Sequence, residues 1–382
     1  MSDAEARARR IVTDAPTDLI VDRLAAELLR TYGITRTELF QVDYRLAELL
    51  PLGGGESVTG PGHPAWYAFD HQEPMVADGT GWFPVGMRGE RRGVLRVSPA
   101  PADPAARAEL ATIAAVLGHE LAAVTSTTDV YLTARRSRRL TLAAEMQWEL
   151  LPGRSRIRPS FALAGQLEPA YAVRGDSFDW SDDGHRLWLA VLNGFGEGVA
   201  AALLTSLATF ALRNARRAGL SLADQAALAD QAIYAQHRGR QHLAVLLMEV
   251  DLATGALTAV DAGSPHLIRL RAGAVTQQVL DKQFPLGMFD GTDYREQRFQ
   301  LARGDRLFVV SDGVVDAAAG RIRYGESALD RFLRHTGPLE PLDAVRSLIG
   351  DLRAFVAGDL VDDAVVVCLD WLGPQPENGP DQ

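Results

Sequence analysis

The sequence predicts an α+β fold with mostly antiparallel sheets, divided between two domains. Its 382 residues suffice for two domains of about 150 residues each and a connector. From residue 160 onward, strand patterns and helix patterns come in blocks and do not alternate strictly, which is typical of antiparallel sheets. Turn signals at Ala253–Gly255 and Ala272–Gly273 separate neighbouring strand patterns and indicate hairpins.

The composition indicates a globular protein without affinity for nucleic acid or membranes. Hydrophobic residues make up 47% of the chain, while the formal net charge of −10 disfavours binding to anionic polymers and surfaces. No window holds eighteen uninterrupted apolar residues, and the N-terminus lacks the apolar segment of a signal peptide. The single cysteine, Cys368, cannot form an internal disulfide, which favours a cytoplasmic location. Because it lies in the apolar run AVVVCLDW, we expect Cys368 to be a buried core residue.

The first part of the chain is predicted to contain a small domain and a connecting helix. Residues 1–16 are polar and expected to be disordered. Residues 17–125 predict an amphipathic helix, a strand, the hairpin WFPVGMRGERRGVLRVSP and a long closing helix. Residues 126–152 predict one connecting helix ending at Pro152, with its RRSRR run on a solvated face.

This order of elements, with RGERRGVLRV before the closing helix, resembles a GAF domain, a small α/β sensor module. The resemblance implies binding of a small ligand, or formation of a homodimer through this domain. A structural dimerisation module without any ligand is the alternative. The sequence alone leaves both open.

Acidic residues at the ends of apolar runs are the main chemical feature of the second part. Asp312 follows RLFVVS, Asp362 precedes DAVVVCL, and Asp176 follows Gly175. Carboxylates at strand ends can converge on a divalent cation, which prefers oxygen ligands and offsets their mutual repulsion. A single Asp–Gly pair is more often a turn, so the order and spacing of the stretches carry the prediction.

That order, over residues 140–371, resembles the SpoIIE/RsbU-type branch of the metal-dependent (PPM) protein serine/threonine phosphatases. The matching segments are, in chain order, AAEMQWELLP, EPAYAVRGDSFDW, NGFGEGVAAALL, ATGALTAVDAGSP, FPLGMF, GDRLFVVSDGVVDA and VDDAVVVCL. The resemblance implies that residues 153–371 form an α-β-β-α sandwich of two antiparallel sheets flanked by helices. Residues 372–382 form a tail that is disordered by composition.

The resemblance also implies a site with two Mn²⁺ or Mg²⁺ ions that activate a water for in-line attack on phosphorus. Residues carried over as catalytic and metal-binding are Asp176, Asp312 and Asp362, with Gly194 offering its backbone carbonyl. Asp179 and Asp363 match family acids whose direct ligation is open. The implied substrate is phosphoserine or phosphothreonine on a regulatory protein, an anti-anti-sigma factor of the STAS type.

Several residues depart from the family pattern. Asn193 stands where the family has the aspartate that bridges both metals, and an amide oxygen can ligate at most one of them. Arg174 replaces a glycine, and we expect it to face solvent; pointing inward, it would repel metal or pair with the substrate phosphate. Glu197 and Ser264 replace histidines, and Glu197 could restore some negative charge.

Two functions therefore remain open. The first is a working phosphatase regulated by the GAF-like domain, in which Asn193 is tolerated. The second is a pseudophosphatase that keeps the fold for partner binding. The three matching acids favour the first function slightly, and Asn193 favours the second.

Overall fold

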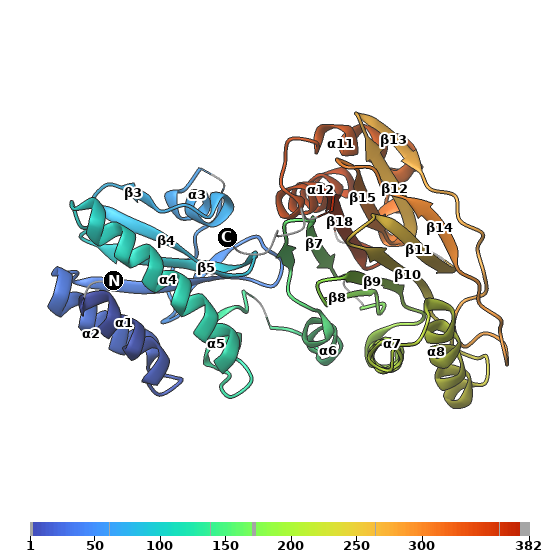
Figure 1. Ribbon diagram of the computed structural model, residues 1–382, viewed down its shortest axis with the longest axis horizontal. Coiled ribbons are helices and arrows are strands. Elements are labelled where there is room, and N and C mark those ends of the chain that lie inside the picture. The colour runs from blue at the N-terminus through green and yellow to red at the C-terminus, as the bar shows by residue number, and fades with distance from the viewer. Residues whose placement is uncertain are drawn as a thin grey trace, which may run out of the picture. The chain divides into compact units, whose positions relative to one another are not determined.

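A computed structural model describes residues 3–60, 62–137, 139–169, 173–263, 265–358 and 360–374. The chain divides into two compact units, Met1–Arg139 and Leu140–Gln382 (Figure 1). This division falls inside the segment 126–152 that the sequence predicts as a connector.

The N-terminal unit is a five-stranded antiparallel sheet with helices on both faces. Its strands run in the order β2-β1-β5-β4-β3. The strands are β1 (Arg36–Val42), β2 (Leu49–Pro51), β3 (Met75–Ala77), β4 (Thr80–Met87) and β5 (Glu90–Ser98). The helices are α1 (Asp3–Asp14), α2 (Ile20–Tyr32), α3 (Pro64–His71), α4 (Pro104–Val124) and α5 (Val130–Ala134).

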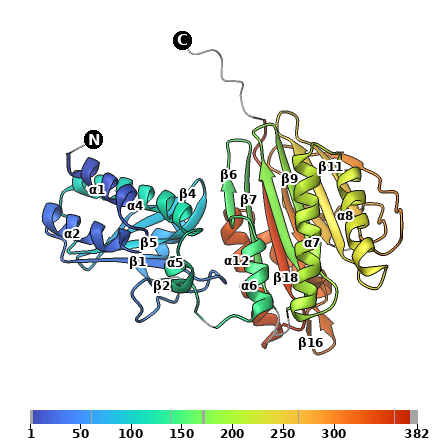
Figure 2. The same cartoon turned by 90° about the horizontal axis from the view of Figure 1, so that it is seen from below.

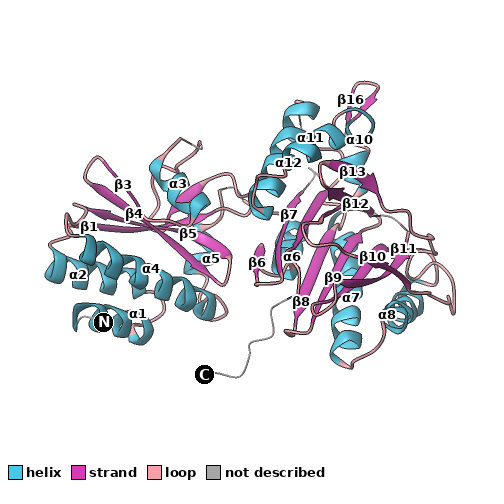
Figure 3. Cartoon of the chain, turned by 45° about the horizontal axis from the view of Figure 1, so that its top comes forward, coloured by secondary structure: helices cyan, strands magenta, loops and turns pink. Residues whose placement is uncertain are grey.

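Alternation along the strands assigns the two faces of this sheet. Leu39, Phe83 and Leu95 join the core beneath α1, α2 and α4. Phe40 and Trp82 point to the opposite face, where α3 lies (Figure 3). The hairpin predicted for this region is confirmed, because β4 and β5 pair antiparallel.

The predicted disorder of residues 1–16 is wrong, because Asp3–Asp14 forms helix α1. Ala8 and Val12 lie one helical turn apart and are fully buried in the core of the N-terminal unit. Alanine and arginine dominate this stretch, so it is polar on average, although its few apolar residues lie on one helical face.

The predicted single connecting helix over residues 126–152 is also wrong. Helix α5 ends at Ala134, and a separate helix α6 (Leu142–Leu150) begins after Thr141, whose side chain caps it. Between them, Arg135 donates to the carbonyl of Val42 and its guanidinium lies over the ring of Tyr44. These contacts fix the chain after α5 to the N-terminal unit and interrupt the helix.

The C-terminal unit contains two larger antiparallel sheets and a small hairpin. The first sheet has the order β14-β11-β10-β9-β8, and the second has the order β13-β12-β15-β18-β7-β6. The helices are α6, α7 (Gly198–Arg217), α8 (Leu222–His237), α9 (Asp312–Val315), α10 (Tyr324–Ser327), α11 (Leu329–His335) and α12 (Pro341–Val356).

The strands of the two larger sheets are short to medium in length. They are β6 (Ser155–Ile157), β7 (Phe161–Glu168), β8 (Ser177–Asp182), β9 (Arg186–Asn193), β10 (Ala244–Asp251), β11 (Ala256–Ala262), β12 (His266–Arg271), β13 (Ala274–Gln277), β14 (Gln297–Gln300), β15 (Arg306–Val310) and β18 (Ala364–Trp371). Strands β16 (Ala318–Ala319) and β17 (Ile322–Arg323) form the hairpin.

The two sheets stack with helices on their outer sides (Figure 2). Helices α7 and α8 share a core with β9, β10 and β11, while α12 packs on β7 and β18. Gly165 of β7 makes room for the ring of Phe178 of β8, since an added Cβ would lie 2.9 Å from that ring. The buried run of β18 includes Cys368, and burial raises the pKa of its thiol, so it is no nucleophile.

Helix α7 is long and apolar enough, by length and composition alone, to pass as a candidate membrane span. However, 44% of its apolar window is buried inside the unit. Leu204, Ala208 and Leu212 recur at helical spacing on the face that packs on the first sheet. The pattern is therefore that of a helix packed on a sheet.

Candidate metal and phosphate site

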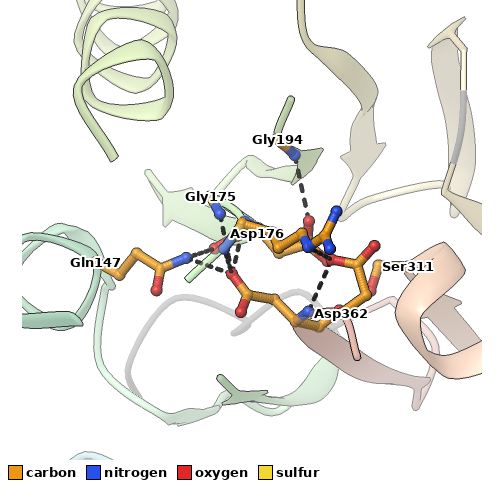
Figure 4. Close-up of polar contacts among 8 residues, drawn as sticks. Gln147, Gly175, Asp176, Gly194, Ser311 and Asp362 are labelled. Carbon is orange, nitrogen blue, oxygen red and sulfur yellow. Dashed lines mark hydrogen bonds and ion pairs between the residues drawn. The ribbon is translucent and has the colours of Figure 1, made fainter. Parts of the chain in front are cut away.

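Strand ends from both larger sheets of the C-terminal unit meet at one site. Asp176 precedes β8 and Asn193 ends β9 in the first sheet. Asp312 follows β15 and Asp362 lies just before β18 in the second sheet. Figure 4 shows the polar contacts among the residues gathered there, of which Gln147, Gly175, Asp176, Gly194, Ser311 and Asp362 are labelled.

Asp363 anchors the turn that leads into β8. This residue is fully buried, and its Oδ2 accepts hydrogen bonds from the backbone N–H groups of Arg174 at 2.8 Å and Gly175 at 2.9 Å. A longer bond of 3.4 Å comes from the N–H of Asp176, and Gln147 donates its Nε2 at 2.8 Å. This carboxylate oxygen is saturated with donors, so its evident role is to hold the turn in place.

Asp176 is fully buried but only partly supplied with donors. Its Oδ1 accepts the N–H of Gly194 at 3.2 Å, whereas its Oδ2 has no hydrogen-bond partner among the described residues. Burial, and then the negative charge of Asp363, raise the pKa of Asp176 well above its usual range, against the opposing effect of the Ser311 hydroxyl. A buried carboxylate oxygen without a donor is costly unless a cation or a proton compensates it.

Asp312 and Asp362 complete the acidic cluster. Asp312 Oδ1 is also buried, with no hydrogen-bond partner in the described parts of the chain. Burial and the charge of Asp312 raise the pKa of Asp362 to about 6, against the opposing charge of Arg174. Gly313 lets the backbone after β15 lie against the backbone of Asp363, because an added Cβ would lie 1.9 Å from the carbonyl oxygen of Asp363.

Arg174 faces the acids, so the expectation that it faces solvent is wrong. Its Nε lies 3.9 Å from Asp362 Oδ1, and its side chain is 40% exposed. Nε itself is buried and makes no hydrogen bond to any residue that the structure describes. The turn held by Asp363 fixes the backbone of Arg174 and thereby directs its side chain toward Asp362.

Asn193 and Gly194 bring the glycine loop against the same turn. Ser177 pairs with Leu192, so one step further along the antiparallel register Asn193 lies opposite Asp176. An added Cβ on Gly194 would lie 2.5 Å from the carbonyl oxygen of Arg174, so only glycine permits this approach. Asn193 is 9% exposed at the end of β9.

Two of the sequence-predicted site residues are not brought into the cluster. Asp179 is buried and forms ion pairs with Arg213 at 2.8 Å and Arg216 at 3.3 Å, both on helix α7. Its charge is therefore committed to holding α7 against β8. Glu197 is exposed just before α7, and none of the described contacts links it to the acids. Ser264 lies outside the described residues.

Gln147 and Thr205 also support the site, and neither is among the site residues predicted from the sequence. Gln147 of α6 is fully buried and donates to the carbonyl of Asp176 as well as to Asp363. Thr205 of α7 donates to the carbonyl of Gly175, whose positive φ of 95° favours glycine. Gln147 could have been singled out from the AAEMQWELLP segment that carries the family resemblance.

The donor set has the chemistry for a divalent cation but is not arranged around one. Among the described residues, no group of three or more His, Cys, Asp or Glu residues is placed to hold a metal ion. The two unpartnered oxygens, Asp176 Oδ2 and Asp312 Oδ1, are nevertheless hard anionic ligands in a buried site. The charge of these two oxygens could be offset by one cation, whereas Arg174 and Asn193 disfavour a second.

Comparisons with known proteins identify relatives of the C-terminal unit. Residues 183–372 match the family model for Stage II sporulation protein E (SpoIIE). Phosphoserine phosphatase RsbP of Bacillus subtilis (strain 168) is 25% identical over 165 residues, which cover 42% of this chain and 38% of RsbP. The chain thus matches well under half of that relative's length.

Two solved structures are similar to the C-terminal unit, and the first of them supports the same fold. The RsbU and RsbW domains of Rv1364c from Mycobacterium tuberculosis superpose with a TM-score of 0.50 and 23% identity, covering 57% of this chain and 63% of that one. The SiaA-PP2C domain of Pseudomonas aeruginosa gives a TM-score of 0.49 and 22% identity, covering 55% and 85%.

The C-terminal unit is therefore a phosphatase domain of the PPM class. Within that class, it belongs to the SpoIIE family, in its SpoIIE/RsbU-type branch. The matched range includes Asn193, Asp312 and Asp362, and Asp176 lies shortly before it. The recognition made from the sequence is confirmed for this unit.

Proposed function

We propose that the C-terminal unit is a divalent-metal-dependent protein serine/threonine phosphatase. The observation that carries this proposal is the pair of buried carboxylate oxygens, Asp176 Oδ2 and Asp312 Oδ1, that lack hydrogen-bond partners among the described residues. Such oxygens are costly to bury, and a bound cation would compensate both. Membership of the SpoIIE family supports the same conclusion.

The residues of this site would act in distinct ways. Asp176, Asp312 and Asp362 would hold Mn²⁺ or Mg²⁺, with the backbone carbonyl of Gly194 as a further ligand. A bound ion of this kind would supply a Lewis acid for the phosphoryl group and lower the pKa of a water. Asp363 would act as a positioning residue, because it fixes the turn that carries Asp176.

The substrate class follows from the relatives. RsbP is named a phosphoserine phosphatase, and we propose phosphoserine or phosphothreonine on a regulatory protein as the substrate here. An anti-anti-sigma factor of the STAS type is the proposed partner, and the cytoplasm is the proposed location. The substrate, the partner and the location rest on analogy with the family.

For the N-terminal unit we propose a GAF-like sensor that regulates the phosphatase. A cavity of about 560 Å³ lies on the α3 face of its sheet. Trp82 lines this cavity, with the ring of His63 at 5.2 Å and the guanidinium of Arg96 at 5.5 Å. Aromatic faces beside a cation suit a small planar ligand, and a homodimer is an additional proposal for this unit.

A pseudophosphatase is the second candidate. It is favoured by Asn193 at the bridging position and by Arg174, whose guanidinium already faces Asp362. In that case the domain would bind a phosphorylated partner without turnover. The acids would then be retained for the fold and for electrostatic balance.

Hydrolysis of p-nitrophenyl phosphate across a Mn²⁺ titration tests the proposed function. We expect turnover that requires Mn²⁺ and is lost in Asp312→Ala, with Asp290→Ala as an acid-to-alanine control at an exposed position. Turnover in the wild type would reject the pseudophosphatase. Absence of turnover in the wild type at saturating Mn²⁺, with turnover in Asn193→Asp, would reject the phosphatase.

A further inference from the structure

Arg174 and Asn193 change the charge of the acidic cluster in the same direction. In the family pattern that the sequence resembles, these two positions carry a glycine and an aspartate. The arginine adds one positive charge and the asparagine removes one negative charge. Both changes act on the same small volume, because Asn193 lies opposite Asp176 and Arg174 lies two residues before it.

The position of Arg174 is fixed from two sides. Its N–H donates to Asp363 Oδ2 at 2.8 Å, and its carbonyl lies against Gly194, which has no room for a Cβ. The backbone of Arg174 therefore cannot withdraw without breaking the turn. Its Nε, buried and with no hydrogen bond within the described ranges, is 3.9 Å from Asp362 Oδ1.

Asn193 cannot replace an aspartate that shares two cations. Its amide offers one neutral acceptor oxygen, and its NH₂ group only donates. Among the described residues of this site, the carboxylate oxygens left without donors belong to Asp176 and Asp312, and the amide oxygen of Gln147 also lacks one; Asp362 already has the guanidinium beside it. Asp362 is therefore supplied with a cation by the chain itself.

We infer that this site holds a single divalent cation, between Asp176 and Asp312, and that the guanidinium of Arg174 takes the place of a second one beside Asp362. This inference rests on the proposed function. Although Nε is buried, the side chain of Arg174 is 40% exposed, and a guanidinium is a strong donor for a phosphoryl oxygen. Arg174 thus has two tasks: it neutralises Asp362, and it binds a phosphoryl oxygen of the phosphorylated side chain.

Mn²⁺ stoichiometry in a double-mutant cycle tests this inference without relying on activity. The full-length proteins are the wild type, Arg174→Gln, Asn193→Asp and the double variant, measured by calorimetry and by electron paramagnetic resonance. We expect one Mn²⁺ per chain in the wild type and in both single variants. The double variant should bind two, with the signal of two coupled Mn²⁺ ions, because the substitutions act on one site.

Arg174→Gln preserves the backbone N–H that Asp363 needs, so the turn should remain intact. Arg186→Gln is the matched control, because Arg186 is an exposed arginine paired with Glu249 elsewhere in this unit. The control should bind one Mn²⁺ like the wild type. A second readout is the KM for p-nitrophenyl phosphate, which Arg174→Gln should raise about tenfold while Arg186→Gln leaves it unchanged.

Each outcome decides the inference. Two Mn²⁺ ions in the wild type, two in Asn193→Asp alone, one in the double variant, or none in any variant would each overturn it. Its failure is distinguishable from failure of the proposed function. A wild type that binds one Mn²⁺ without turnover would reject the phosphatase and support the single-cation site. A wild type that turns over substrate with two Mn²⁺ ions bound would support the phosphatase and reject the single-cation site.

Discussion

Four acids of the C-terminal unit form two groups whose environments are opposite. Asp363 and Asp179 are buried and saturated, the first by N–H donors of the turn before β8 and the second by two arginines of α7. Asp176 and Asp312 each keep a buried oxygen without a hydrogen-bond partner among the described residues. Asp362, the sequence neighbour of Asp363, belongs to neither group because it lies beside Arg174, so sequence position alone does not assign a role to a carboxylate.

Among these four residues, the acids whose oxygens are supplied with donors stabilise the fold, and the acids that keep an oxygen without a donor are available for a ligand. Removing a satisfied carboxylate leaves buried donors without acceptors, which costs stability. Removing an unsatisfied carboxylate relieves repulsion among like charges and costs ligand affinity instead. Substitutions in the two groups should therefore separate stability from metal binding.

Asp363→Ala should have the largest effect on stability. It removes the acceptor for three backbone N–H groups and for Gln147, so we expect a loss of about 3–5 kcal/mol in the free energy of unfolding. Urea denaturation of the full-length protein measures this loss. Asp363→Asn, which retains one acceptor oxygen, should lose less; equal losses would show that the acceptor role is unimportant.

Asp179→Ala should cost about 2–3 kcal/mol in the free energy of unfolding, because it leaves Arg213 and Arg216 near the protein interior without their shared counter-ion. Mn²⁺ affinity should remain within about twofold of the wild type, since Asp179 is turned toward α7. Calorimetric titration with Mn²⁺ checks the second point. A large loss of affinity would move Asp179 into the ligand-binding group.

Asp312→Ala should behave in the opposite way. We expect Mn²⁺ affinity to fall at least about 10–100-fold, the range seen for outer-shell changes at metal sites. The unfolding free energy measured with a chelator present should stay within about 1 kcal/mol of the wild type, since a charge in the acidic cluster is removed. A chelator-independent loss of several kcal/mol would instead assign Asp312 to the fold.

Substitution of Asp261 should have the smallest effect on stability. This residue is a control because its carboxyl is buried but is not one of the acids assigned to the cluster. Burial raises the pKa of its carboxyl to about 6, and the N–H of Gly263 donates to its Oδ1 at 3.1 Å. Because the folded state binds this proton more tightly than the unfolded state, wild-type stability should rise as the pH falls from 7 to 5. In Asp261→Asn, that rise should be smaller by about 1 kcal/mol. Equal pH profiles for the two proteins would show that this carboxyl is not perturbed.

The sequence predicts much of the second unit because local patterns carry the information. Apolar strand runs, turn signals and acids at strand ends follow from neighbouring residues, and the antiparallel sheets and helix α7 match those patterns. The meeting of Asp176, Asp312 and Asp362 could be anticipated through the family resemblance. Whether these residues ligate a metal stays a prediction.

The environments of individual side chains could not be predicted in this way. The partner of Asp179 is 34 residues away and the partner of Asp363 is 216 residues away, so no local pattern announces either bond. The inward direction of Arg174 depends on the turn that Asp363 holds. The helix over Asp3–Asp14 was missed because its burial depends on packing in the core of the N-terminal unit.

Anomalous diffraction at the manganese edge, on crystals of the full-length protein grown with Mn²⁺, tests the central claim most directly. We predict one strong anomalous-difference peak in this cluster, next to Asp176 and Asp312, with the guanidinium of Arg174 still beside Asp362. Two peaks in the cluster, or a peak coordinated by Asp179, would contradict it.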